Sequence, residues 1–384
     1  FHRHASCSCP MCGLCQDECE EVMEALCKTG RLDNTLLIIT GDNGDSFPRA
    51  KSNLYDLGCH VPFAVRWPGV IKPGSVCDGF ISLMDLTATF YEAAGVKPKE
   101  KMDSRSLIPV FKGDYTACRK EIYSDRERHT NTRPGGYGYP MRSVQDKDFL
   151  YIRNLYPDRL PAGTDPVYGD TGHGPAKAFM VFQRDKYPKE IFDRAFGLRP
   201  AEELYDLRKD PGCLNNVADS VSYAKTKKKM SWRLTSWMKR TSDPRVDPGN
   251  LCFDTLPYVR KAMRIALIET EGCLKDSHGK DIDWVRAQIE KLRKQGVKVI
   301  ELRAAGDLTE YVAALNNIKD QNALTGREIT LLSGTETGIL AAKEAGIIPA
   351  GVTWGGTDAK TMVMSGASYV LTNQEELELC LDFL

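Results

Sequence analysis

An acid, an amide and a lysine follow a strongly apolar stretch near the start of the chain. Residues 41–51 read GDNGDSFPRAK and come directly after TLLIIT, which predicts a buried strand. Asp42 and Asn43 therefore lie at the carboxyl end of that strand, where ligands gather in open α/β sheets. Carboxylate and amide oxygens suit Ca2+, which takes about six to eight oxygen ligands, so two side chains cannot fill that shell. The alternative is that Asp-Asn-Gly forms only a turn.

Thirteen cysteines offer a second possible chemistry. Cys9, Cys12, Cys15 and Cys19 have the spacing C-x2-C-x2-C-x3-C, which is typical of bacterial iron–sulfur proteins. Thiolates at C-x2-C spacing also bind zinc. We favour a third interpretation, in which residues 1–16 are an irregular segment that binds no metal, because short motifs of this kind often occur by accident.

The elements that would position these residues alternate between helix and strand. We expect a helix over 17–29, strands over 35–40 and 60–69, and a helix over 82–95, which is an α/β order. From about residue 120 the pattern changes. It predicts a hairpin over 139–154 and long surface loops over 155–200. Within 202–219 it predicts a strand, a turn at Asp-Pro-Gly and the entry to a helix, and over 223–240 it predicts a basic helix.

A second β/α alternation begins after a segment rich in Pro, Gly and charge. We expect a linker over 245–257 and then a smaller domain with a parallel sheet over 258–384. Its first helix, over 283–296, places Val285, Ile289 and Leu292 on one face.

The composition argues against two classes of partner. Lys plus Arg and Asp plus Glu are both 52, so net charge gives no attraction to nucleic acid or to an acidic membrane surface. No apolar run approaches the roughly 18–20 residues that span a bilayer, so we predict no nucleic-acid or membrane partner. The chain has no recognisable signal peptide, and its compartment is not predicted.

Residues 17–244 resemble the sulfatase family. The stretch from LDNTLLIITGDNGDSFPRAK to MDLTATFYEAAGV carries the resemblance, and YSDRERH, GYPMRSVQDKDFLYIRN and EELYDLRKDPG continue it. The nearest branch contains N-sulfoglucosamine sulfohydrolases. The resemblance implies part of an alkaline-phosphatase-like sheet followed by a small antiparallel subdomain over about 120–244. It also implies hydrolysis of sulfate esters or sulfamates on glycosaminoglycan-type sugars.

The family's site residues can be carried over where they match. Asp42 and Asn43 then correspond to the later half of a Ca2+ site, and Lys51 to the cation that binds the sulfate group.

Three residues of the DRERH stretch are further candidates for contact with the sugar. His129 is one, and Arg126 and Arg128 would pair with its sulfate or carboxylate groups. The alternative for all three is an exposed charged loop.

The family's nucleophile is not found in this sequence. Its members use a formylglycine made within C/S-x-P-x-R, and the nearest match, SCPMC at 8–12, has Cys12 in place of the Arg. The Asp-Asp pair of the first half of the Ca2+ site is also not found. We therefore expect the C-terminal part of a sulfatase, inactive by itself.

Residues 327–381 resemble the end of haloacid-dehalogenase-type (HAD-type) phosphatases, especially phosphoglycolate-phosphatase-like members, with a Rossmann-like sheet, and residues 264–277 are similar to their opening strand and loop. The family's D-x-D-G-T reads Glu269-Thr270-Glu271-Gly272-Cys273 here, which makes Glu269 and Glu271 the candidate catalytic residues. The later Mg2+-binding motif retains Glu336 as its only carboxylate. The resemblance implies Mg2+, but the altered motifs favour a folded remnant without catalysis.

Three hypotheses follow from these patterns. The chain is a sulfatase-family hydrolase fragment, a HAD-type phosphatase with a sulfatase-like appendage, or a non-catalytic fused remnant. Ca2+-dependent binding of a sulfated glycan would support the first hypothesis. Mg2+-dependent hydrolysis of p-nitrophenyl phosphate would support the second.

Overall fold

The computed structural model describes residues 10–383 apart from 131, 134–135, 173–174, 248, 257–262, 277 and 304–305. The chain divides into two compact units. One unit runs to Asp42 and resumes at Val61–Ile122, and the other contains Asn43–His60 and Tyr123–Leu384.

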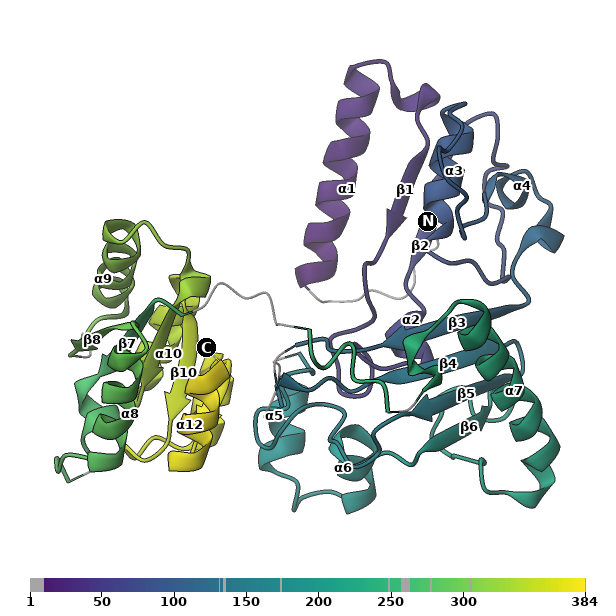
Figure 1. Ribbon diagram of the computed structural model, residues 1–384. Coiled ribbons are helices and arrows are strands. Elements are labelled where there is room, and N and C mark those ends of the chain that lie inside the picture. The colour runs from purple at the N-terminus through teal and green to yellow at the C-terminus, as the bar shows by residue number, and fades with distance from the viewer. Residues whose placement is uncertain are drawn as a thin grey trace. The chain divides into compact units, whose positions relative to one another are not determined.

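The first unit contains a two-stranded antiparallel sheet and helices (Figure 1). Strands β1 (Leu37–Thr40) and β2 (Phe63–Arg66) pair so that Leu37 lies opposite Arg66. The unit's helices are α1 (Pro10–Lys28), η1 (Leu32–Asn34), α3 (Asp85–Ala93), α4 (Ile108–Phe111) and η2 (Tyr115–Ala117). The expectation of a buried strand at β1 was wrong. Its residues are half-buried or exposed because, among the described residues, β2 is its only neighbour in the sheet.

Helix α1 begins earlier than the sequence pattern indicates. Residues 10–16, predicted to be irregular, belong to this helix, and the predicted helix over 17–29 is confirmed as its continuation to Lys28. Of the four cysteines at iron–sulfur spacing, Cys9 lies outside the described residues and the other three lie within α1.

The second unit contains a four-stranded antiparallel sheet in the order β3-β4-β5-β6 (Figure 1). The strands are β3 (Glu121–Arg126, which begins in the first unit), β4 (Met141–Asp146), β5 (Phe149–Asn154) and β6 (Glu202–Asp206). The predicted hairpin over 139–154 is confirmed, with Met141 opposite Asn154. Successive side chains of β5 point to opposite faces, so Tyr151 joins one core cluster and Ile152 another.

Helix α7 (Ala224–Arg240), which confirms the basic helix predicted over 223–240, covers one face of this sheet. Its buried residues Met230, Leu234 and Met238 pack with Tyr151. Two short 3-10 turns flank it, η4 (Val221–Tyr223) and η5 (Pro244–Val246).

The opposite face of the sheet receives the segment that follows the Asp-Asn pair. Leu54 and Tyr55, just before the short helix α2 (Asp56–Cys59), pack against Met141 and Tyr205. The apolar face of the antiparallel sheet therefore holds a loop that precedes all four of its strands in the chain.

Residues 155–200 are more ordered than the predicted long surface loops. They include α5 (Pro175–Phe182) and α6 (Lys189–Phe196), and Tyr168, Val181 and Phe196 form a buried cluster of their own. The expectation was wrong because the aromatic residues that interrupt the Pro- and Gly-rich sequence pack on one another.

The segment predicted as a linker contains a buried arginine. The Arg245 side chain is 0% exposed and pairs with Glu127 and Asp254 at 2.7 and 3.0 Å. Arg142 on β4 joins the same network through Glu127 and Asp243. The charged residues of this segment therefore form buried ion pairs that hold it against the antiparallel subdomain, and the segment is not a solvated linker.

The C-terminal part of the chain forms the predicted parallel sheet, in the order β11-β10-β9-β7-β8 (Figure 1). Its strands are β7 (Ile265–Glu269), β8 (Lys298–Leu302), β9 (Ile329–Ser333), β10 (Ile348–Val352) and β11 (Tyr369–Leu371). Its helices and turns are η6 (Thr270–Leu274), α8 (Asp283–Lys294), α9 (Leu308–Gln321), η7 (Gly326–Glu328), α10 (Glu336–Glu344), α11 (Ala359–Ser365) and α12 (Gln374–Phe383).

Helices cover both faces of this sheet. Alternate residues of β7 serve the two cores, since Ala266 packs with α8 and α12 whereas Leu267 packs with α9 and α10. Helix α8 buries Val285, Ile289 and Leu292, which confirms the predicted face. Among the helices that the structure describes, none combines the length and the apolar character needed to cross a membrane.

Candidate functional site

The Asp-Asn pair follows the end of β1, as the sequence predicts. β1 ends at Thr40, and the side chains of Asp42 and Asn43 are exposed. The boundary between the two compact units falls between these two residues. Their oxygen donors have the right chemistry for Ca2+. Within the part of the chain that the structure describes, no group of three or more His, Cys, Asp or Glu side chains could hold a metal, so the assignment as ligands stays a prediction.

Two glycines allow the loop after this pair to close tightly. A Cβ atom on Gly44 would lie 2.1 Å from the carbonyl oxygen of Leu57. On Gly58 it would lie 2.3 Å from that of Asn53. Only glycine permits such close backbone approach, so the loop over 44–58 has a defined, compact path.

Arg49 and Tyr55 anchor this loop to the antiparallel sheet. The Arg49 guanidinium lies 3.8 Å from the centre of the Tyr55 ring and donates to the carbonyl oxygen of Cys213 at 2.5 Å. The Tyr55 hydroxyl donates to Glu203 Oε2 at 2.7 Å. Burial raises the pKa of Tyr55, so the hydroxyl remains a donor at neutral pH.

Lys51 lies at the centre of this anchored loop. Its backbone N–H donates to the carbonyl oxygen of Asp45 at 2.9 Å, and its own carbonyl accepts from Asn53 Nδ2 at 3.1 Å. The side chain is half-buried. Within the described residues no acceptor pairs with its ammonium group. The loop thus fixes the backbone at Lys51 and leaves the charge of its side chain available.

A buried carboxylate, Asp170, organises the DRERH stretch. It accepts from Arg126 at 2.6 Å and from Arg133 at 2.7 Å. The backbone N–H of Thr130 donates to it at 3.1 Å. Burial alone would raise the pKa of Asp170, but the hydrogen bond to His129 and the two guanidinium charges hold it well below its usual range.

The three predicted sugar contacts occupy different environments. Arg126 is buried, and burial lowers its pKa to about 10. His129 is partly exposed, with Nδ1 3.2 Å from Asp170 Oδ1. Arg128 donates to the carbonyl oxygens of Gly136 and Leu256 at 3.0 and 2.9 Å. Asp170 thus brings Arg126 and His129 together, and Arg128 points elsewhere.

Some guanidinium nitrogens near Asp170 have no hydrogen-bond partner among the residues that the structure describes. Nε and Nη1 of Arg126 and Nη1 of Arg133 are buried and unsatisfied. The cluster therefore contains more donors than acceptors.

Glu269, the first HAD-type candidate, is buried at the end of β7 with its oxygens already occupied. It accepts from the Tyr311 hydroxyl at 2.7 Å, from the Ser333 hydroxyl at 2.8 Å and from the Gly334 N–H at 3.1 Å. Burial raises its pKa, although these donors oppose that effect. A Cβ atom on Gly338 would lie 2.1 Å from Glu269 Oε1, so the backbone of α10 closes over the carboxyl.

The donors around Glu269 do not fit Mg2+. Glu271 is exposed, and Glu336 is exposed and accepts from the Ser365 hydroxyl at 3.2 Å. Three hydrogen-bond donors already occupy the Glu269 carboxyl, and among the described residues no group of three or more His, Cys, Asp or Glu side chains could hold a metal.

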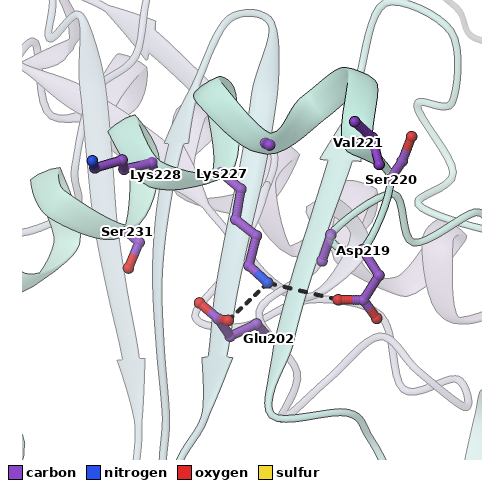
Figure 2. A pocket seen from close by; sticks show the side chains of 9 residues that line it. Glu202, Asp219, Ser220, Val221, Lys227, Lys228 and Ser231 are labelled. Carbon is purple, nitrogen blue, oxygen red and sulfur yellow. Dashed lines mark ion pairs between the residues drawn. The ribbon is translucent and has the colours of Figure 1, made fainter.

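A pocket of about 450 Å³ lies beside the start of α7, away from all the predicted site residues. Figure 2 shows Lys227 between two acids, with its ammonium 2.9 Å from Glu202 and 3.7 Å from Asp219. The Lys227 cation is therefore already paired, whereas Lys228, which is exposed, also lines the pocket.

Several residues that build these sites carry no motif. Asp170 lies among Pro and Gly residues that read as a loop, and Glu203 lies in a strand. For Asp170, the one signal in the sequence was an acidic residue in a segment otherwise rich in Pro, Gly and Tyr.

More than half of the chain is similar in sequence to known sulfatases. Residues 16–96 match the family model described as sulfatase. An ulvan-active sulfatase of Formosa agariphila is 34% identical over 224 residues, which cover 58% of this chain and 41% of that protein. N-sulphoglucosamine sulphohydrolase of Homo sapiens is 30% identical over 235 residues, which cover 58% of this chain and 45% of that protein. The chain thus spans less than half the length of these relatives.

Solved structures give fainter likenesses. A protein in complex with its substrate D-glucosamine-2-N,6-O-disulfate is 22% identical, with a TM-score of 0.43 over 60% of this chain and 38% of that one. A deoxy-D-mannose-octulosonate 8-phosphate phosphatase from Haemophilus influenzae is 16% identical, with a TM-score of 0.25 over 32% of this chain and 88% of that one. These scores are low, and the fold described above rests on its own elements. The sulfatase resemblance read from the sequence is confirmed.

Proposed function

We propose that this chain supplies the later part of a sulfatase-type site that binds sulfated, glycosaminoglycan-type sugars. The observation that carries the proposal is Lys51, a cation without a partner among the described residues, on a loop fixed by Arg49 and Tyr55. The similarity to sulfatases over more than half of the chain supports a sulfate group as the anion that this cation would bind.

Lys51 would bind the sulfate group. A fixed ammonium offsets negative charge on sulfate oxygens without having to reorganise. Asp42 and Asn43 would supply part of a Ca2+ shell, and Ca2+, when bound, adds positive charge beside the same anion. Two side chains fill only part of that shell, so the proposal includes weak Ca2+ affinity for the chain by itself.

His129 would contact the sugar, with Arg126 in a positioning role. The Arg128 guanidinium already donates to the carbonyl oxygens of Gly136 and Leu256, so we propose no contact with the sugar for Arg128. His129 has one ring nitrogen held by Asp170 and is exposed enough to offer the other to a ligand. Arg126 is buried and donates a hydrogen bond to the same carboxylate. It therefore acts on a ligand through Asp170 and His129.

The test is binding of N-sulfoglucosamine to the purified chain in the presence of Ca2+, measured by ligand-observed NMR titration. We expect Lys51→Ala to weaken binding by about tenfold to a hundredfold, because a charge-assisted hydrogen bond is worth about 1.5–3 kcal/mol. The matched control is Lys72→Ala, since Lys72 is exposed and outside the loop. Equal affinity in the two variants would contradict the assignment of Lys51.

We also propose that the 384 residues by themselves bind without hydrolysis, because the sequence contains no C/S-x-P-x-R motif. Ion chromatography of the same samples measures the free sulfate that hydrolysis would release. Release of free sulfate from N-sulfoglucosamine would show that another residue serves as the nucleophile.

A further inference from the structure

Two cysteines that are distant in sequence meet in the first compact unit. The sulfur atoms of Cys77 and Cys118 lie 3.4 Å apart although 41 residues separate them in the chain. Both are free thiols; Cys77 is exposed and Cys118 is half-buried. A disulfide needs a sulfur–sulfur distance of about 2 Å, which small rotations of the two side chains can supply.

The backbone on both sides of this pair is held independently of the thiols. Phe80 and Arg119 form an isolated antiparallel bridge, and the Arg119 N–H donates to the Phe80 carbonyl at 2.9 Å. The Arg119 guanidinium also donates to buried Asp85, with Nε 2.9 Å from Oδ2. The encounter of the two sulfurs therefore follows from the fold around them.

Gly79 makes room for the Cys118 side chain. A Cβ atom on Gly79 would lie 2.5 Å from both Cβ and Sγ of Cys118, and 3.5 Å from Sγ of Cys77. Any other residue at position 79 would displace the Cys118 thiol. The close packing of three residues from two segments distinguishes this pair from cysteines that are merely near each other.

We propose that Cys77 and Cys118 form a thiol–disulfide exchange site whose substrate is a low-molecular-weight disulfide such as oxidised glutathione. The product is an internal disulfide that closes the segment carrying α3 and α4. This inference is independent of the sulfated-sugar proposal, because it uses none of the residues assigned there.

The reaction has two balanced steps. The Cys77 thiol, the exposed one, loses its proton, and its sulfur attacks one sulfur of oxidised glutathione, which breaks that S–S bond and releases one glutathione thiolate. The Cys118 sulfur, after losing its proton, attacks the Cys77 sulfur and releases the second glutathione. The two protein thiols lose two protons and two electrons, and the oxidised glutathione becomes two reduced molecules.

The order of attack follows from exposure and acidity. Burial raises the pKa of Cys118 to about 11, and the neighbouring Cys77 thiol adds to this effect. Cys118 is therefore protonated at neutral pH and is the slower nucleophile, so it resolves the mixed disulfide and does not start the reaction.

The test equilibrates the full chain in glutathione buffers of increasing oxidised fraction, traps free thiols by alkylation and identifies peptides by mass spectrometry. We expect a peptide that joins Cys77 to Cys118 at ratios where Cys27, an exposed cysteine of α1, is still alkylated. Addition of dithiothreitol should restore both thiols. The proposal fails if the two cysteines stay free, if each carries glutathione without joining, or if Cys77 joins a different cysteine.

Two variants keep the test sharp. Gly79→Ala should slow formation of the joined peptide by about tenfold or more, because reactions that depend on position lose rate steeply with small displacements. Cys27→Ser is the matched control and should leave the rate unchanged. Circular dichroism confirms that each variant is folded. A Gly79→Ala variant that is folded and reacts at the original rate would overturn the geometric basis of the proposal.

Discussion

At the scale of single residues, Asp170 is the charge on which the DRERH stretch depends. Its carboxylate pairs with Arg126 and Arg133, and both guanidinium groups are nearly as buried as the carboxylate. Removing one member of such a set leaves uncompensated buried charge, which costs more than the pair itself contributes. The cluster is therefore a structural requirement first, whatever His129 contacts.

We expect Asp170→Asn to lower the free energy of unfolding by about 3–5 kcal/mol, because two buried guanidinium groups lose their counter-charge. Urea unfolding followed by circular dichroism measures this. Asp165→Asn is the matched control, since Asp165 pairs with Arg184 at the surface and the change should cost about 1 kcal/mol or less. Similar losses in the two variants would contradict the central place of Asp170.

The same residue gives a pH dependence of known sign. The pKa of Asp170 is lower in the folded protein than in the unfolded chain, so its contribution to stability is fully present above the unfolded value of about 3.8. That contribution is lost as the pH falls further toward the folded value. Unfolding free energy should therefore fall more steeply below about pH 4 in the original protein than in Asp170→Asn.

The sequence suggests some candidate residues but not the partners of others. Asp42 and Asn43 are candidates because they follow an apolar strand, and Lys51 is a candidate because of the sulfatase resemblance. Asp170 was not found, because its partner Arg126 lies 44 residues away and nothing local marks the pair.

At the scale of elements, the loop over 44–58 depends on close backbone approach. Gly58→Ala would place a methyl group 2.3 Å from the Asn53 carbonyl oxygen, which requires the loop to open. We expect this variant to lose about 1–3 kcal/mol of stability and to weaken sugar binding as much as Lys51→Ala does. Thermal melts and the NMR titration measure the two effects.

Gly212→Ala is the control for this element. A Cβ atom there meets only the Leu214 side chain, at 3.6 Å, which is ordinary contact. If Gly58→Ala binds N-sulfoglucosamine as well as Gly212→Ala does, the loop does not position Lys51.

Element prediction succeeded where the period of apolar residues was clear. Helix α8 buries the face that its sequence predicts, and the 139–154 hairpin forms. It failed over 155–200, where Pro and Gly suggest loops. There Tyr168 packs on Phe196, and no regular spacing of apolar residues in the sequence indicates that contact. It also failed for β1, whose burial depends on how many strands pair beside it.

At the scale of the whole molecule, the chain joins a sulfatase-like part to a Rossmann-like parallel sheet. We expect the purified chain with Mg2+ to hydrolyse p-nitrophenyl phosphate no faster than a heat-denatured sample. The reason is that Glu269 is buried and hydrogen-bonded to Tyr311 and Ser333, so it cannot reach a phosphate. Hydrolysis above that background, lost in Glu269→Gln, would favour the phosphatase hypothesis.

The sequence alone determined which parts of the chain are α/β, the likeness to sulfatases, and Asp42, Asn43 and Lys51 as candidates, because these depend on local order and on collinear motifs. Only the tertiary structure decided that Arg245 in a Pro-rich segment is buried, that Asp170 holds Arg126 and Arg133, and that Cys77 meets Cys118. Each of these is a contact between residues far apart in the chain. Such contacts arise when packed elements bring distant segments together, and no periodicity along the sequence records them.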